Sequence, residues 1–312
     1  MKMKNKKFLI TIDTEGDNLW DWKPGKEIRT KNVQYLSSFQ NLCEEYGFKP
    51  VWLSNYEMLN DPLYVDFICS RVEKGCAELG MHLHAWNTPP EYDLKGDAKG
   101  ASYLIEYPKD VMEAKVATMT ELIKERCGIN PVSHRAGRWA MNDTYFDILT
   151  KYGYKADTSV TPGVDWSNHP GQSQGSKGSD YSKAACKPYS YRGILEVPVT
   201  IRKVHSLFAP RKDGLRGRLG QMKRMIKGEN LWIRPSLCSE EKIMHLLDIM
   251  DKDDSDYLMF MMHSSEFMPG GSPYFPSEQS IEALYAGLKR LFERVKNLEG
   301  FTLDEYTQQF GK

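Results

Sequence analysis

The chain has 312 residues, which exceeds the usual size of a single core but lies within the range of one α/β barrel. Apolar residues make up 40% and charged residues 27%, a composition that excludes an intrinsically disordered chain. Because 42 Lys and Arg balance 42 Asp and Glu, no net field favours nucleic acid or an anionic membrane, and a neutral ligand such as a glycan fits better.

The sequence also shows no sign of secretion or membrane insertion. The basic start is followed by a short apolar segment at 8–12, which is far shorter than the apolar region of a signal peptide. No apolar run approaches the ~20 residues that a membrane span needs. The six cysteines are scattered without CxxC spacing, and we interpret them as reduced core residues. We therefore expect a cytoplasmic protein.

Short apolar segments alternate with longer amphipathic ones, which is typical of βα units and a parallel sheet. The first unit pairs a strand at 8–12 with a helix that runs from Val33 to a C-cap at Gly47. Further strands are predicted at 51–53, 78–84, 131–135, 194–201, 231–233 and 257–262. Further helices are predicted at 62–74, at 112–123, from Asn142 to Gly153, and from near Ser239 and Ser277.

Seven or eight such parallel segments favour an α/β fold of the (β/α)7-8 barrel type, a distorted TIM-like barrel closed or nearly closed on itself. We expect one domain over 1–312. At about 161–192 the sequence turns to Gly, Ser, Pro, Asn and Lys with little periodicity, which predicts a loop-rich insertion that is either functional or partly mobile.

Catalytic groups of parallel barrels gather where strands end, so polar residues that terminate apolar runs are the candidates. The first strand ends in Asp13 and Glu15, whose spacing of two puts both carboxylates on one face. An exposed acidic turn or a helix N-cap is the alternative interpretation. In 78–84, His82 and His84 share a face in the same way, and two histidines with a carboxylate form a zinc-binding set. The alternative is that they are core histidines.

Three further strand ends carry polar groups. Arg135 can clamp a carboxylate, whereas the neighbouring Arg138 and Trp139 are either a sugar contact or a surface cation packed on an aromatic ring. Asp157 would need a partner if it is buried. His263 closes a strongly apolar strand, where its pKa can be tuned for acid catalysis.

In chain order, the segments TIDTEGD, ELGMHLHAW, SHRAGRW, DTSVTPGVDW and FMMHSSE resemble the five motifs of the polysaccharide deacetylases, carbohydrate esterase family 4 (the NodB homology domain). The resemblance spans residues 8 to about 275 and is nearest to a glycan-biosynthesis subset. It implies that Asp13 is the catalytic base, that Arg135 orients this base, and that His263 is a general acid held by Asp157.

The same resemblance implies a divalent metal, with zinc as the expected ion, bound by Glu15 and His82. The second metal histidine of the family usually stands four residues after the first, where this chain has Trp86. His84 is the substitute, because it shares a face with His82. Aromatic rings expected near the mouth for sugar stacking are Trp86, Trp139, Trp166 and Tyr274, with core packing as the alternative.

The expected reaction is removal of an N-acyl group, most simply N-acetyl, from an amino sugar of a glycan or of a lipid- or nucleotide-linked precursor. Three alternatives stay open. One is a deformylase or another C–N hydrolase using the same groups. A second is a non-catalytic glycan-binding protein that lost its metal site to Trp86. The third is an amidohydrolase-type barrel, in which HxH normally opens the chain.

Overall fold

The computed structural model describes residues 5–23, 26–95, 101–205 and 228–310. Its main sheet has seven parallel strands in the order β10-β1-β2-β3-β4-β5-β7, with β6 antiparallel at the edge and β11 beside the start of β1. Their bounds are β1 (Lys7–Thr14), β2 (Pro50–Ser54), β3 (Glu78–Leu83), β4 (Ser133–Ala136), β5 (Ala156–Asp157), β6 (Tyr189–Tyr191), β7 (Ile194–Glu196), β10 (Tyr257–His263) and β11 (Glu299–Phe301). The predicted barrel of parallel strands is therefore confirmed.

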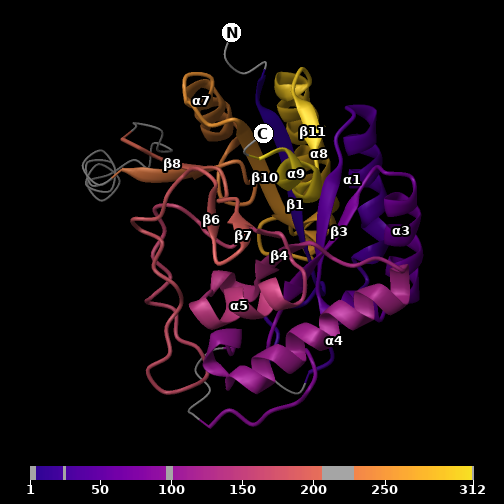
Figure 1. Cartoon of the computed structure of the whole chain (residues 1–312). Helices are drawn as coiled ribbons and strands as arrows, with labels where there is room; N and C mark the ends of the chain where they lie inside the picture. Colours follow the sequence, from indigo (N-terminus) through magenta and orange to yellow (C-terminus); the bar gives the residue numbers. More distant parts are fainter. Residues whose placement is uncertain (1–4, 24–25, 96–100, 206–227, 311–312) are drawn as a thin grey trace, which may run out of the picture.

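Helices cover the outside of the curled sheet (Figure 1). Those described are α1 (Val33–Glu45), α2 (Tyr56–Leu59), α3 (Pro62–Glu73), α4 (Lys109–Cys127), α5 (Asp143–Lys151), α7 (Glu240–Met250), α8 (Glu278–Val295) and α9 (Leu303–Gln309). Short 3-10 turns lie at η2 (Leu104–Glu106), η3 (Gly137–Trp139) and η4 (Ser264–Phe267). Each long helix buries an apolar stripe; in α1, Leu36 and Phe39 are fully buried, three residues apart on the inner face.

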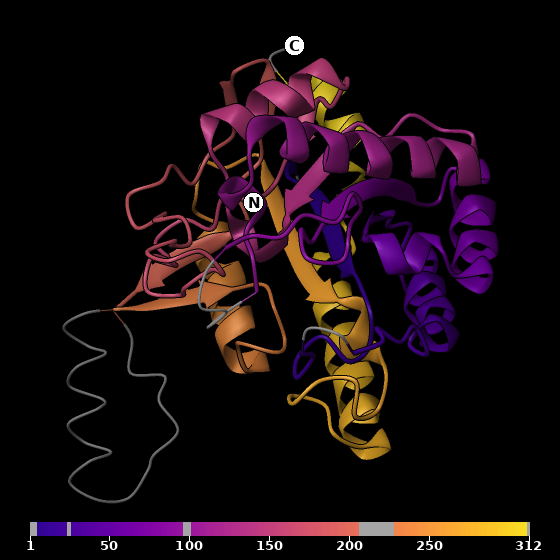
Figure 2. The ribbon, with the colours of Figure 1, turned by 90° about the horizontal axis from the view of Figure 1, so that it is seen from below.

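β1 and β10 form the centre of the molecule, and they lie side by side in both views (Figure 2). All seven residues of β1 from Phe8 to Thr14 are buried, as expected for a parallel strand covered on both faces. β10 pairs with β1 over its whole length, from Tyr257 beside Lys7 to His263 beside Asp13. This register brings the ends of the two strands, and the polar residues there, to the same level.

One predicted strand divides between the two sheets, and another lies outside the parallel sheet. The run at 194–201 divides into β7 and the start of β8 (Ile201–Val204), and the run at 231–233 belongs to β9 (Glu229–Trp232). β8 and β9 pair antiparallel in a separate two-stranded sheet. Periodicity could not show this, because an apolar run is buried equally well in either arrangement. The barrel is consequently open between β7 and β10, where Met261 N donates to the carbonyl of Ile233 at 3.2 Å.

The prediction of six reduced cysteines is wrong for two of them. Cys69 of α3 and Cys127 at the end of α4 form a disulfide, with Cα atoms 5.4 Å apart. They are separated by 58 residues, so only the packing of α3 beside α4 brings them together. The remaining four are free, and Cys43 and Cys238 are buried as expected.

The segment 161–192 is mostly irregular, as predicted, but it contains two isolated bridges and ends in β6. It packs against the end of β4: the Tyr181 hydroxyl donates to the carbonyl of Trp139 at 2.6 Å, and Arg138 Nη2 donates to that of Pro170 at 3.0 Å. The loop thus forms a wall beside the C-terminal ends of the strands. Among the described residues, no helix is both long and apolar enough to cross a membrane.

Candidate active site

Three side chains from the ends of β1 and β3 converge. His84 Nε2 lies 2.7 Å from Glu15 Oε2 and 3.1 Å from His82 Nε2, and His82 Nε2 lies 3.6 Å from the same carboxylate oxygen. All three residues are buried. The structure therefore brings the three predicted metal ligands together. His84 supplies the second histidine, although the family's usual spacing would put that histidine at Trp86.

The chemistry of these donors fits a divalent cation. His82 Nδ1 lies 2.9 Å from the carbonyl of Arg135, which can only accept, so Nδ1 carries the hydrogen and Nε2 holds a lone pair. When Glu15 is ionised and both rings are neutral, His82 Nε2, His84 Nε2 and Glu15 Oε2 converge. At most one of these three atoms carries a hydrogen, so the cluster is rich in lone pairs that a cation could accept. Donors around one tetrahedral zinc ion lie roughly 3.2–3.4 Å apart, close to these separations.

The electrostatics favour the ligand forms of two of these groups. Burial opposes ionisation of Glu15, but its bonds to His82 and His84 outweigh burial and hold its pKa well below the ordinary value. Burial lowers the pKa of His84, which keeps that ring neutral. The Glu15 backbone is fixed as well, because its N–H donates to Ser264 Oγ at 3.0 Å and its carbonyl accepts from Asn32 Nδ2 at 2.8 Å.

Asp13 lies beside this cluster and is held by Arg135. Arg135 Nη1 donates to Asp13 Oδ1 at 2.5 Å, and its other nitrogens bond to the Thr158 carbonyl and Thr11 Oγ1 at 2.9 and 2.8 Å. Burial would raise the pKa of Asp13, but the guanidinium, with His82 and His263, outweighs it and lowers this pKa. The structure thus brings Arg135 and Asp13 together, as the resemblance implies, and this ion pair leaves Oδ2 of Asp13 unengaged by Arg135.

His263 faces Asp13 from the neighbouring strand, with Nε2 3.8 Å from Asp13 Oδ2. Its other nitrogen, Nδ1, lies 3.0 Å from Arg234 Nη2 and 3.5 Å from Glu266 Oε2. Arg234 and Glu266 were missed in the sequence. Arg234 directly follows the apolar run 231–233, so the rule that polar residues ending a strand are candidates would have found it.

The prediction that Asp157 holds His263 is wrong. Asp157 Oδ1 bonds to His134 Nδ1 at 2.6 Å, and Ser159 N donates to Oδ2 at 3.0 Å. Burial and the neighbouring Asp157 carboxylate raise the pKa of Glu196 well above its ordinary value. This pair is fully buried below the site. The reason is topological: β5 lies beyond β4 in the sheet, whereas β10 lies on the other side of β1.

A cavity of ≈ 360 Å³ opens above these groups. Its lining includes the predicted contacts Arg138, Trp139, Trp166 and Tyr274, together with Trp20, Tyr103, His169 and Leu237, which were not predicted. Trp139 and Trp166 have nearly parallel rings 6.5 Å apart. Trp86 differs: its ring packs on that of His84, with ring centres 4.1 Å apart, and Trp86 lines a separate cavity.

Gly137 leaves room for His84. A Cβ added at Gly137 would lie 2.4 Å from the carbonyl oxygen of Leu83 and 2.9 Å from His84 Nδ1. We expect Gly137→Ala to displace His84 and to weaken binding of a divalent cation about tenfold to a hundredfold, as disturbed metal-site supports do. A chelator competition measures this affinity. Gly287→Ala on α8 is the matched control, since a Cβ there meets nothing nearer than 3.8 Å. Equal affinity in both variants would contradict this role of Gly137.

Glu57 of α2 should make stability depend on pH. Its carboxyl is buried and accepts from Gly16 N at 2.7 Å and from Asn87 Nδ2 at 2.6 Å. Burial raises the pKa of Glu57 to about 7 from 4.5. Because the folded state holds this proton more tightly, the stabilisation is complete below pH 4.5 and is lost as pH rises through 7, about 3 kcal/mol in all.

Urea unfolding at several pH values between 4.5 and 7.5 tests this expectation about Glu57. Glu57→Gln, which stays neutral, should flatten that part of the stability profile. Glu73→Gln changes an exposed carboxyl on α3 and is the control. An unchanged slope in Glu57→Gln would show that other groups cause the pH dependence.

No known family profile matches the chain, and no curated protein matches its sequence. Solved structures do. A candidate polysaccharide deacetylase of Mycobacterium smegmatis is 14% identical over 97% of this chain and 90% of that one, with a TM-score of 0.55. A 4-alpha-glucanotransferase of Thermococcus litoralis is 14% identical over 98% of this chain but 41% of that one, with a TM-score of 0.58. A GH57 branching enzyme of Thermococcus kodakaraensis is 10% identical over 99% and 72%, with a TM-score of 0.58.

The chain therefore has the curled β/α-barrel fold of a polysaccharide deacetylase, as its sequence motifs predict. The glucanotransferase and the branching enzyme share this fold, although their names describe other reactions. This chain spans about two fifths of the length of the glucanotransferase. At these identities the likeness concerns the fold alone. The reaction has to be argued from the residues of the site.

Proposed function

We propose that this protein is a metal-dependent hydrolase that removes an N-acyl group, most simply N-acetyl, from an amino sugar. One observation carries the proposal. The carboxylate of Asp13 is held by a buried arginine, and it lies beside both the cluster of three metal-ligand atoms and His263. Amide hydrolysis needs a base, a Lewis acid and a proton for the leaving nitrogen, and this arrangement has a residue or cluster for each.

The residues that would hold the cation are Glu15, His82 and His84. Zinc is the proposed ion, because two imidazoles and one carboxylate are a common zinc set that leaves a position open for chemistry. When bound, such a cation supplies the Lewis acidity that polarises the acyl carbonyl and acidifies water. The chain's own part is to present one lone pair each from His82 and His84 and one carboxylate oxygen.

Asp13 would act as the base through Oδ2. Its other oxygen is engaged by Arg135, and this ion pair keeps the carboxylate ionised and fixes its direction. As water attacks the acyl carbon, Oδ2 accepts the water proton. Arg135 is thus a positioning residue, since it touches Asp13 and lies fully buried below the cavity.

His263 would supply the proton that the leaving nitrogen needs, because an amide anion is a very poor leaving group. Nδ1 has two neighbours: Arg234 donates to it when the ring is neutral, and Glu266 can accept from it when the ring is charged. In both forms Nε2 keeps its hydrogen and faces Asp13 and the cavity. Arg234 and Glu266 replace Asp157 in the positioning role that the sequence suggested.

The substrate is proposed to be the N-acylated sugar of a glycan or of its lipid- or nucleotide-linked precursor. The nearly parallel rings of Trp139 and Trp166 at the cavity wall offer flat apolar faces for sugar rings. A formyl group would meet the same catalytic groups, so a deformylase remains the second candidate. A cytoplasmic location is part of this proposal.

A non-catalytic glycan-binding protein is disfavoured by the position of His84. That interpretation requires Trp86 to have removed the second metal histidine, but the His84 ring completes the ligand set. The ligand atoms are therefore present even though the usual spacing is not.

The experiment is a screen for released acetate or formate from N-acylated amino sugars, free and linked to nucleotide or lipid, with and without a chelator. We expect turnover that the chelator abolishes and added zinc restores. Metal content of the purified protein is measured in parallel. Turnover that persists without metal would contradict the proposed site, and release of formate alone would assign the second candidate.

A further inference from the structure

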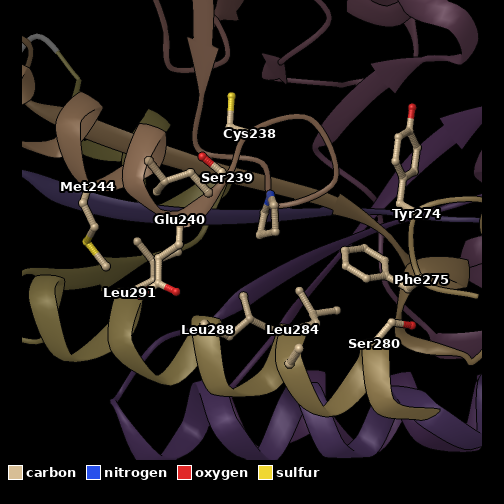
Figure 3. Close-up of a pocket in the computed structure, with 14 residues that line it drawn as sticks. Cys238, Ser239, Glu240, Met244, Tyr274, Phe275, Ser280, Leu284, Leu288 and Leu291 are labelled. Atoms are coloured by element: carbon tan, nitrogen blue, oxygen red, sulfur yellow. The ribbon is translucent and has the colours of Figure 1, made fainter. Parts of the chain in front are cut away.

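An apolar groove of ≈ 320 Å³ lies between α7 and α8. Ile243 and Met244 of α7 form one wall, and Leu284, Leu288 and Leu291 of α8 form the other. In Figure 3, Met244 extends from α7 toward α8, Leu284 and Leu288 extend from α8 toward the gap, and Phe275 points into it at one end. Because its lining is mostly aliphatic, the groove suits a hydrocarbon chain better than a sugar ring, which needs partners for its hydroxyl groups.

The groove adjoins the proposed active site. Tyr274 lines both cavities, and Pro235 of the groove directly follows Arg234 of the site. The Tyr274 ring packs edge-on against Trp20 at 5.5 Å, and Trp20 packs against the ring of His263 at 5.1 Å. A ligand held at His263 therefore has a continuous aromatic path toward the groove.

The passage between the two cavities is apolar and exposed. Trp20, Leu237 and Tyr274 are 38%, 43% and 42% exposed, and all three line the active-site cavity. Large apolar side chains gathered at the mouth of a cavity mark a surface that an apolar ligand covers. Tyr274 also lines the groove, so this apolar surface continues from the active-site cavity into the groove.

The groove offers no charge to a ligand. Its described lining has one acidic or basic side chain, Glu240, and both oxygens of Glu240 bond to Arg290, at 2.5 and 2.6 Å. The other hydroxyl groups of the lining belong to Ser239, Ser280 and Tyr274. The occupant that matches this surface is uncharged hydrocarbon.

We propose that the groove binds the hydrocarbon chain of a lipid-linked amino sugar while its N-acylated sugar lies in the active site. This inference rests on the proposed function and narrows its substrate to glycolipids whose chain leaves the sugar past Tyr274. Free and nucleotide-linked sugars would leave the groove empty.

The test compares octyl and methyl glycosides of N-acetylglucosamine, below the micelle concentration of the octyl compound. Each methylene that leaves water contributes a factor of about three to four, so a seated chain should raise kcat/KM at least about tenfold over the methyl glycoside. Gly287→Phe fills the groove from α8 and should bring this ratio to about one. Gly287→Ala is the matched control and should keep the ratio, because a Cβ at Gly287 meets nothing nearer than Glu240 Oε2 at 3.8 Å, an ordinary contact. Met244→Trp fills the groove independently from α7 and should likewise bring the ratio to about one. Thermal unfolding of each variant verifies that it is folded.

Calorimetric binding of octyl glucoside, which has no N-acyl group, separates the two proposals. The groove assignment is wrong if the octyl-to-methyl ratio of kcat/KM is near one in the unmodified chain, or if both blocking variants leave this ratio unchanged. Either result would still support the proposed hydrolase. If neither glycoside is turned over but octyl glucoside binds and Gly287→Phe abolishes this binding, the groove stands and the hydrolase fails. Loss of both turnover and binding overturns both. A dimer in light scattering that Gly287→Phe dissociates would assign the groove to a second copy instead.

Discussion

Asp13→Asn is expected to lower kcat for N-acyl hydrolysis by a factor of about 10²–10⁴, the usual contribution of a positioned base. The amide keeps an oxygen for Arg135 but cannot take a proton from water. The three metal-ligand atoms of Glu15, His82 and His84 are unchanged, so the variant should still bind a divalent cation. Steady-state kinetics and metal analysis of the same preparation measure both effects.

Stability must be followed in the same variant, because Arg135 is fully buried and loses its charged partner. Breaking a buried ion pair by removing one partner costs about 3–5 kcal/mol, less when a hydrogen-bond acceptor remains. Asp17→Asn is the matched control, since Asp17 is also buried and paired, with Arg29 at 3.1 Å. Near-normal turnover in Asp13→Asn would remove Asp13 from the mechanism, whereas a loss of turnover in both variants would point to a general effect on the fold.

His84→Ala is expected to weaken cation binding more than a hundredfold and to abolish turnover at ordinary metal concentrations. The reason is that His84 contributes one of three ligand atoms, whereas disturbing a supporting residue alone costs about tenfold to a hundredfold. Competition with a chromogenic chelator measures the affinity. Turnover should partly return at high zinc concentration, because His82 and Glu15 remain.

Trp86→Phe is the control for His84. It keeps an aromatic ring against His84, where the two rings now lie 4.1 Å apart, and it removes no ligand atom. Its cation affinity should be close to that of the unmodified chain. If Trp86→Phe lost the cation and His84→Ala kept it, the substitution of His84 for the usual second histidine would be wrong, and the non-catalytic interpretation would gain weight.

The sequence predicted much of the site because its main residues lie at the ends of apolar runs. The spacing of two in Asp13 and Glu15, and again in His82 and His84, depends only on the local geometry of an extended chain. The structure brings Glu15, His82 and His84 together as this spacing predicts. The contact of Arg135 with Asp13 agrees with what the family resemblance of the motifs implied.

Other features needed the tertiary structure, because they join residues that no local pattern relates. The partners of His263 are Arg234, which follows β9, and Glu266 of η4. Asp157 pairs with His134 because β5 lies beside β4. The Cys69–Cys127 disulfide and the antiparallel pairing of β8 with β9 are of the same kind.

By itself, the sequence determined where the chain alternates between strand and helix and which polar side chains end the strands, since both depend on periodicities of the backbone. Which of these ends become neighbours was decided by strand order and register. Asp13 meets His263 because β10 pairs with β1 in a register that sets these two residues side by side. The groove beside them likewise exists only once α7 and α8 pack at the same edge, so a hydrocarbon site next to the catalytic groups has no signature in either segment alone.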